Sequence, residues 1–217
     1  MKRNINLIAI LFLSMVVFSC KKNDFDYQEG YIGVSKVTNY ASFDMKGETY
    51  VVVPKGSTYT EPGVTAKEGD KELAVKTTGT VNTNVAGVYN LSYSAVNADG
   101  FAASTDRTVI VSDVSPAAAA VDLSGNYART SNGSVSTWTR LAPGVYSVFN
   151  PGGAPGTNVT VIVFHLDANT IDFPQQIASD GGSFSGTSET FNPATKTYSW
   201  AVVNGGYGPA VRTFVKQ

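Results

Sequence analysis

Short runs of β-branched and aromatic residues, separated by turn-forming residues, recur from about residue 40 to the end of the chain. In the clearest run, which follows Gly87, apolar and polar side chains alternate over residues 89–95. Side chains two positions apart lie on the same face of a strand, so this alternation predicts a half-buried antiparallel strand. The repeated pattern predicts an all-β chain.

Residues 40–113 are expected to form an immunoglobulin-like β-sandwich of about seven strands. Turns are indicated at Glu61-Pro62-Gly63 and at Asp99-Gly100. Tyr89 is a candidate corner tyrosine, whose hydroxyl would bind the backbone; packing of its ring in the core is the alternative.

Three stretches of this module resemble the Ig-like domain of bacterial surface proteins. They are residues 59–66 with the Glu-Pro-Gly-Val turn, residues 81–95 with Val-Asn-Thr and then Gly-Val-Tyr, and residues 107–111, Arg-Thr-Val-Ile-Val. The resemblance implies a spacer that lifts a distal module from the membrane, and it supplies no catalytic residue.

The composition changes sharply at residues 114–121, Val-Ser-Pro-Ala-Ala-Ala-Ala-Val. We interpret this segment as a Pro/Ala linker between domains, with a short alanine helix as the alternative. Residues 122–217 predict a second all-β domain, an antiparallel meander that forms an open barrel or curved sheet. Residues 151–156 are expected to be too rich in glycine to pack against a core. The expected strands are 126–130, 135–141, 145–150, 159–166, 170–175, 183–190, 197–204 and 210–215.

The second module resembles the C-terminal β-domain that accompanies this Ig-like module in lipoproteins of Bacteroidota. Residues 123–129, 191–200 and 212–217 carry the resemblance. It implies an accessory lipoprotein of an outer-membrane nutrient importer of the starch-utilisation type, in which a barrel transporter and its lipoprotein lid take up glycans or peptides. The partners it implies are therefore a glycan or peptide, or a component of the importer.

Residues 1–19 have the pattern of an export signal. Lys2 and Arg3 precede an apolar stretch, residues 7–18, which is too short to cross a bilayer core of about 30 Å as a helix. Cys20 is the only cysteine, and the residues before it resemble a bacterial lipobox, although Phe18 stands where a small residue, Leu or Val is commoner. The resemblance implies that Cys20 is acylated and anchors the protein in the membrane. A chance cysteine after an ordinary signal peptide is the alternative.

Residues 20–39 are expected to be a lipidated tether. Lys21, Lys22 and the acidic residues that follow them resemble the surface-export signal of Bacteroidota lipoproteins. This resemblance implies that the protein sits on the outer membrane and faces the cell surface rather than the periplasm.

The composition argues against several classes of function. A formal net charge of −1 gives no electrostatic footprint for nucleic acid. A single cysteine and a single histidine, His165, cannot supply a zinc site. Asp167, Asn169 and Asp172 carry oxygen ligands suited to calcium, but an ordinary turn is favoured there. We therefore expect no metal and no cofactor.

No pattern identifies a catalytic residue. His165 precedes Asp167 in an apolar strand, but such nearness in sequence does not make a catalytic triad, and no nucleophile-elbow motif is present. A partly buried or rim histidine is the favoured interpretation. A carboxylate pair for glycoside hydrolysis stays open as an alternative.

The candidate binding residues are mostly aromatic. In the strand 135–141, Trp138 shares a face with Ser136 and Arg140. Trp138 and Arg140 are therefore candidates, because a tryptophan on a polar face can stack on a sugar ring or anchor a partner, although core packing is the favoured interpretation for Trp138. Phe149 and Tyr207 lie beside glycine-rich loops and are further candidates. Core packing is the favoured interpretation for these two residues as well, and Trp200 is expected in the core.

Together these features predict a non-enzymatic, lipid-anchored protein of the outer membrane. Its expected function is to bind a glycan or peptide nutrient or an importer component. A purely structural lipoprotein of an envelope complex is the alternative, and a hydrolase is the least favoured one.

Overall fold

A computed structural model describes residues 29–32 and 35–217 of the protein. Cys20 and the expected signal peptide lie outside these residues. Two short strands, β1 (Tyr31–Ile32) and β2 (Ser35–Lys36), pair in antiparallel fashion. Residues 40–217 form one compact unit. None of the helices in the described ranges is long and apolar enough to cross a membrane.

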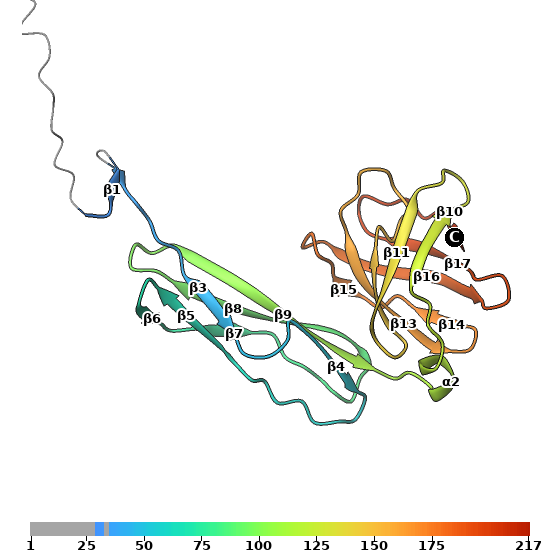
Figure 1. Cartoon of the computed structure of the whole chain (residues 1–217), viewed down its shortest axis with the longest axis horizontal. Helices are drawn as coiled ribbons and strands as arrows, with labels where there is room; N and C mark the ends of the chain where they lie inside the picture. The colour runs from blue at the N-terminus through green and yellow to red at the C-terminus, as the bar shows by residue number, and fades with distance from the viewer. Residues whose placement is uncertain (1–28, 33–34) are drawn as a thin grey trace, which may run out of the picture. The chain divides into compact units, whose positions relative to one another are not determined.

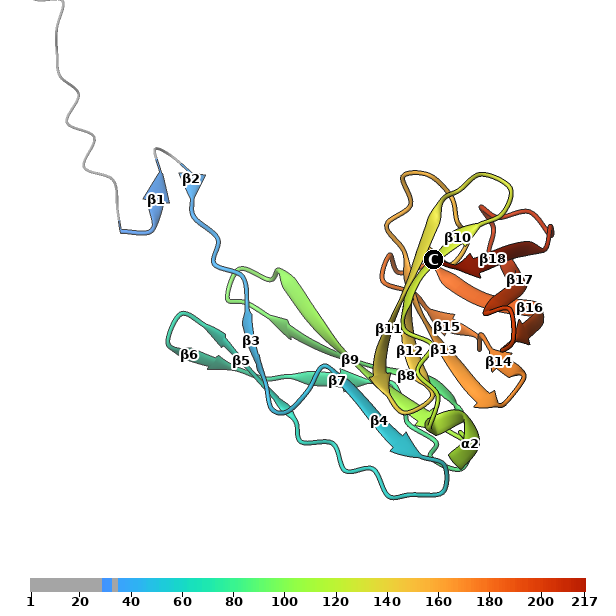
Figure 2. The same ribbon diagram turned by 45° about the vertical axis from the view of Figure 1, so that its right-hand side comes forward.

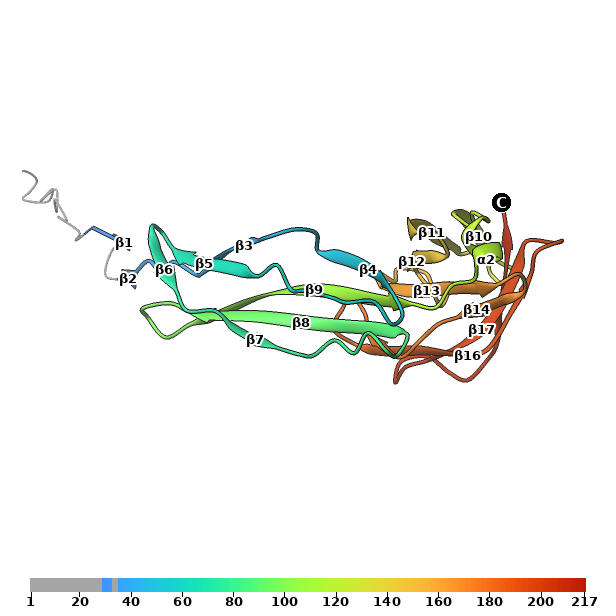
Figure 3. The ribbon, with the colours of Figure 1, turned by 90° about the horizontal axis from the view of Figure 1, so that it is seen from below.

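The first module is a sandwich of a three-stranded and a four-stranded sheet. The strand orders are β3-β5-β6 and β4-β9-β8-β7, and the β4–β9 pair is parallel whereas the others are antiparallel. Figure 3 shows β8 and β9 side by side along their length. The expectation of an Ig-like sandwich is confirmed. Its strands are β3 (Ser42–Met45), β4 (Tyr50–Pro54), β5 (Val64–Glu68), β6 (Lys71–Leu73), β7 (Lys76–Thr78), β8 (Gly87–Val96) and β9 (Ala102–Ser112).

Alternate side chains of β8 point into the core and toward the surface. Leu91, Tyr93 and Ala95 are buried between the sheets, as the period of two requires. The Tyr89 hydroxyl donates a hydrogen bond of 2.8 Å to the carbonyl of Val85, four residues upstream. Tyr89 is therefore a corner tyrosine, which fixes the chain where it enters β8.

A buried ion pair joins two of the sequence motifs of this module. The Arg107 guanidinium is fully buried; its Nη1 lies 3.4 Å from Glu61 Oε1, and its Nη2 donates to the carbonyl of Lys46 at 2.6 Å. The Tyr59 hydroxyl donates to the other Glu61 oxygen. Burial would raise the pKa of Glu61, but the hydrogen bonds and the charge of Arg107 lower it below its usual value. The Glu-Pro-Gly-Val turn is thus tied to the closing strand.

The second module is a nine-stranded antiparallel sheet that curls on itself (Figure 1). Its strand order is β14-β13-β12-β11-β10-β18-β17-β16-β15. Figure 2 shows β10–β12 in yellow on one side of the curl and β16–β18 in red on the other. The predicted antiparallel, barrel-like domain is confirmed. Its strands are β10 (Gly125–Arg129), β11 (Val135–Ala142), β12 (Val145–Phe149), β13 (Thr160–Asp167), β14 (Thr170–Asp172), β15 (Gln176–Ile177), β16 (Ser183–Asn192), β17 (Thr197–Val203) and β18 (Arg212–Lys216).

The curled sheet is held closed by hydrogen bonds between its two ends. The N–H of Gly186 in β16 donates to the carbonyl of Phe173, just after β14, at 2.8 Å. The side-chain amide of Gln176 makes the two hydrogen bonds that a neighbouring strand would make with Ile162. Its Oε1 accepts from the N–H of Ile162 at 2.6 Å, and its Nε2 donates to the Ile162 carbonyl at 2.8 Å. Buried backbone groups of β13 thereby find partners where no full strand pairs with them.

An aromatic core fills the inside of the curl. The rings of Trp138 and Trp200 are stacked, with centroids 5.8 Å apart, and Tyr198 stacks on Phe214 at 4.7 Å. The Tyr127 hydroxyl donates to the carbonyl of Leu123 at 2.7 Å. As with Tyr89 in the Ig-like module, this tyrosine hydroxyl binds the carbonyl of the residue four positions upstream.

The segment expected to be a linker contains one helical turn, α2 (Pro116–Ala119). Ser115 caps it, because its side chain accepts from the N–H of Ala118 at 3.2 Å, and proline occupies the first turn, where its missing N–H costs nothing. The Ser115 N–H donates to the carbonyl of Leu166 in β13 at 3.0 Å. The turn is thus attached to the second module.

Candidate functional site

Trp138 does not face solvent. Its side chain is only 2% exposed and lies in the aromatic core, and Ser136 on the same face is also buried. Core packing, the interpretation weighed against binding for Trp138, is what the structure shows. The opposite face of β11 also carries apolar side chains: Leu141 is partly buried and packs in a second cluster with Ile110 of β9. With apolar residues on both faces, the alternation pattern does not identify the outer one.

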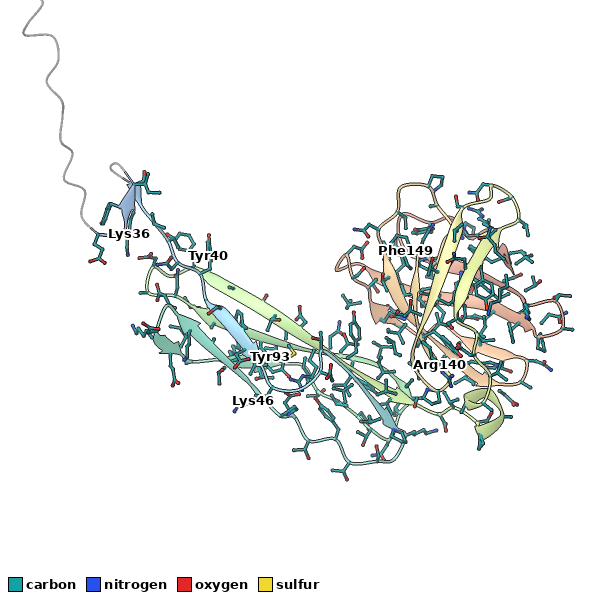
Figure 4. The ribbon with its side chains drawn as sticks, viewed as in Figure 1. Lys36, Tyr40, Lys46, Tyr93, Arg140 and Phe149 are labelled. Carbon is teal, nitrogen blue, oxygen red and sulfur yellow. The ribbon has the colours of Figure 1, made fainter. Side chains whose placement is uncertain are left out.

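Arg140 and Phe149 lie at opposite ends of the β11–β12 pair (Figure 4). Arg140 is exposed, and its Nη2 donates to the carbonyl of Ala119 in α2 at 2.7 Å, so it holds the helical turn. Phe149 is 39% exposed at the end of β12. The structure therefore does not bring the four candidate residues together in one site.

His165 is buried, with 1% of its surface exposed, and its ring packs edge-on against Phe191. Burial lowers its pKa below the usual histidine value. The histidine is thus more deeply buried than the partly buried or rim position expected from the sequence. No group of three or more potential metal ligands occurs within residues 29–32 and 35–217.

Tyr207 lies in a hollow at the loop end of the second domain, which we call the loop-end pocket. Its volume is about 360 Å³. Two glycine-rich loops and the ends of β10 and β18 form its walls. The lining residues are Arg129, Gly152, Ala154, Thr157, Gly206, Tyr207, Gly208 and Arg212.

The first of these loops, residues 151–156, packs against the core, contrary to the expectation from its glycine content. Its Pro151 carbonyl accepts a 2.7 Å hydrogen bond from the Trp200 indole N–H. Asn150, in the left-handed region at φ 54°, donates from Nδ2 to the carbonyl of Val135 and accepts the N–H of Ala154 at Oδ1. The loop is therefore held in one conformation by side-chain amides and the indole.

Gly152 allows the two loops to meet. A Cβ at this position would lie 2.0 Å from the Tyr207 ring, so only glycine permits this contact. The Tyr207 hydroxyl lies 3.2 Å from the Thr157 hydroxyl, and the Arg212 guanidinium sits 5.2 Å from the centre of the Tyr207 ring. Tyr207 is thus a fixed wall of the pocket rather than a free aromatic side chain.

Two arginines supply the charge of the pocket. Arg129 donates from Nη1 to the carbonyls of Gly152 and Gly153, at 3.4 and 3.3 Å. Arg212 is 8% exposed and donates to the carbonyls of Gly208 and Ala210. Burial, and then the like charge of Arg129, lower the pKa of Arg212.

Neither of these arginines was singled out by sequence reasoning, although both lie in segments that carried the family resemblance. The available signal was their position: each stands at the end of a strand in a module with few charged residues, and glycine-rich loops adjoin the pocket they line. What the sequence does not show is that β10 and β18 are neighbours in the sheet.

A second hollow, of about 470 Å³, lies on the other side of Tyr207. Four polar side chains line it, those of Gln175, Ser183, Thr187 and Asn204. The rest of its lining is mostly apolar and includes Ala201, Val202, Val203 and Pro209. Both volumes are within the range of about 300–1,000 Å³ typical of ligand pockets. The lining of the loop-end pocket holds guanidinium and hydroxyl groups but no carboxylate, imidazole or thiol among the described residues, so the chemistry it offers is binding of an anion.

The chain matches a family model and is similar to solved structures. Residues 43–111 match the family model described as "Bacterial surface protein, Ig-like domain". The chain is also similar to the crystal structure of a lipoprotein from Bacteroides thetaiotaomicron, with 26% identity over 82% of this chain and 100% of that one, and a TM-score of 0.38. No curated protein matches. The first module is therefore an Ig-like domain of the bacterial surface protein type, as its motifs predicted.

Proposed function

We propose that this protein is a non-enzymatic, lipid-anchored binding protein of the outer-membrane surface. Cys20 is its anchor, the Ig-like module is a spacer, and the second domain binds a nutrient ligand at the loop-end pocket. A glycan or a peptide is the class of ligand that such a surface protein receives.

The single observation that carries this proposal is the paired arginines of the loop-end pocket. Arg129 and Arg212 direct their hydrogen bonds to backbone carbonyls, and within the described part of the chain neither forms an ion pair with a carboxylate. A partly buried charge without a counter-charge costs free energy, and a folded domain that needed only stability would gain by replacing it. Retained uncompensated charge in a concave site is typical of ligand binding.

The Ig-like domain supports the surface location. Its family is that of bacterial surface proteins, and its buried Arg107 in β9 is paired with Glu61 in the turn before β5, an ion pair that serves the fold rather than a ligand. Acylation at Cys20 would hold the chain stably, since two or more acyl chains anchor a protein that one chain binds only marginally.

The test is binding of the purified full chain, in detergent micelles, to arrays of glycans and of peptides. Ligand capture that is lost in Tyr207→Ala and kept in Phe149→Ala supports the proposal. Phe149 is the matched control because it is an exposed aromatic residue that does not line the loop-end pocket. Co-purification with a barrel transporter, together with no capture on either array, favours the purely structural alternative instead.

A further inference from the structure

The two guanidinium groups that line the loop-end pocket, those of Arg129 and Arg212, are not fully hydrogen-bonded within the described ranges. The Nε atoms of Arg129 and Arg212 are both buried and have no hydrogen-bond partner among the residues that the structure describes. A guanidinium carries five N–H donors in a planar fork, and a buried donor left unpaired costs about 1–3 kcal/mol. An oxyanion that enters the pocket would remove this cost.

The two guanidinium groups also act on each other. Both side chains line the loop-end pocket, and the like charge of Arg129 contributes, after burial, to the lowered pKa of Arg212. Their aliphatic stems are held: Gly153 approaches Arg129 closely enough that a Cβ would lie 2.8 Å from Arg129 Cδ. An anion between the groups would turn this repulsion into two attractions, each of the charge-assisted kind.

The surroundings of the anion position match a saccharide. The hydroxyls of Thr157 and Tyr207 stand 3.2 Å apart at one wall. The second hollow, which shares Tyr207 with the loop-end pocket, combines amide and hydroxyl side chains with an apolar wall of valine, alanine and proline. A sugar ring presents both hydroxyl groups and apolar C–H faces, so it matches this mixed lining. Uncharged amides and hydroxyls are the groups that pair with sugar hydroxyls, because they both donate and accept.

We propose that the loop-end pocket binds the anionic group of an acidic saccharide, with the oxyanion between Arg129 and Arg212 and a neighbouring sugar in the second hollow. The oxyanion is the carboxylate of a uronic acid or the sulfate ester of a sulfated sugar, which share this recognition chemistry. This inference rests on the proposed binding function and narrows it to one class of ligand.

The test is isothermal titration of the purified full chain with four probes. Tetragalacturonate carries carboxylates, its methyl ester has the same rings without charge, a sulfated galactose tetrasaccharide carries sulfate alone, and a peptide with a free carboxyl terminus represents the rival class. The inference expects an acidic saccharide to bind at least about tenfold more tightly than the methyl ester, since hydrogen bonds to charged groups are worth about 1.5–3 kcal/mol. The stronger of the two acidic saccharides identifies the oxyanion.

Variants locate the site. Arg129→Gln and Arg212→Lys are each expected to weaken acidic binding about tenfold or more, because glutamine lacks the charge and lysine lacks the planar fork. Arg140→Gln is the matched control: it removes an exposed arginine that contacts α2 and leaves affinity unchanged. Circular dichroism and urea unfolding check that the variants fold. If an arginine variant does not fold, two measurements on the wild type still test whether an anionic group is recognised. They are the comparison with the methyl ester and the fall in affinity with added salt.

The possible results distinguish a failure of the acidic-saccharide inference from a failure of the proposed binding function. Equal affinity for tetragalacturonate and its methyl ester overturns the anionic assignment and leaves a saccharide-binding protein. Binding of the peptide alone overturns the saccharide assignment. Absence of binding to every probe overturns the inference, and absence of capture on the glycan and peptide arrays overturns the proposed function itself.

Discussion

At the scale of single residues, polar side chains take the place of missing backbone partners. The Gln176 amide completes the hydrogen bonding of Ile162 in β13, and the hydroxyls of Tyr89 and Tyr127 each bind a carbonyl four residues upstream. Asn150 uses both ends of its amide to hold a loop. Each of these side chains is specified by the geometry around it rather than by local propensity.

Gln176→Leu is expected to lower the free energy of unfolding by about 2–4 kcal/mol. The substitution keeps the volume but leaves the buried N–H and C=O of Ile162 without their partner, and each unsatisfied group costs about 1–3 kcal/mol. Urea unfolding measures the change. Gln175→Leu is the control, because Gln175 is exposed and its amide bonds only the side chain of Ser183. Equal losses in the two variants would show that Gln176 has no special place in closing the sheet.

His165 gives the protein a pH dependence of stability. Burial lowers the pKa of the folded-state imidazole, so the unfolded chain binds a proton near pH 6.5 while the folded protein does not. The stability that this histidine contributes is complete above that value and falls as the pH drops toward the folded-state pKa, by at most about 1.4 kcal/mol per pH unit. Chemical unfolding of His165→Leu between pH 7.5 and 5.5 is expected to show a smaller slope than the wild type. Identical slopes would mean that the imidazole titrates alike in both states.

At the scale of elements, the loops of the second domain are as well defined as its strands. Residues 151–153 are buried, and the Trp200 indole and the Asn150 amide bind the loop at its two sides. The facing loop contacts it through Tyr207 on Gly152. The pocket is therefore built before any ligand arrives, which lowers the entropy lost on binding.

Gly152→Ala is expected to abolish ligand capture while the domain stays folded. The added Cβ would lie 2.0 Å from the Tyr207 ring, and Tyr207 must leave its wall of the pocket. Near-ultraviolet circular dichroism reports the displaced aromatic residue, and array binding reports the pocket. Gly156→Ala is the control, since no atom lies within 4 Å of a Cβ there, although its φ of +73° adds some backbone strain. Unchanged capture by Gly152→Ala would show that Tyr207 is not needed.

Most strands of the two modules could be predicted from the sequence because alternation and turn residues are local signals, but β3 was not expected. Each strand expected between residues 126 and 215 is found with shifted ends, whereas the two-residue β15 is too short to leave a pattern. The candidate site could not be predicted in the same way. Tyr207 was a candidate because of its loop, but Arg129 and Arg212 meet only through the pairing of β10 with β18. Binding by Trp138 was considered because polar residues share its face, yet Ser136 on that face is buried with it.

At the scale of the whole molecule, we propose that the chain consists of an anchor, a spacer and a binding domain. The Ig-like module matches its family model over residues 43–111, and its fully buried Arg107 is paired with Glu61 of the same module. The second domain keeps its uncompensated arginines at a pocket. Stability and binding are thus assigned to different parts of the molecule.

Cys20→Ser is expected to release the protein from the membrane fraction into the soluble fraction. Serine has no thiol to acylate, and without acyl chains only weak contacts hold the chain to the bilayer. Mass spectrometry of the wild-type N-terminal peptide should find acyl groups on Cys20. A wild-type protein that carries none, yet pellets with membranes, would contradict the anchor.

The most direct test of the binding account is to follow the arginine Nε–H signals by nuclear magnetic resonance while tetragalacturonate is added to the ¹⁵N-labelled protein. The Nε atoms of Arg129 and Arg212 lack partners among the described residues. Both signals are predicted to shift as the ligand is added and to reach a plateau at the same ligand concentration. The signal of Arg107 should stay in place, because its Nε also lacks a described partner but its side chain does not line the loop-end pocket, and so should the signal of the exposed Arg140. Shifts confined to Arg140, or no shift at any arginine, would contradict the binding account.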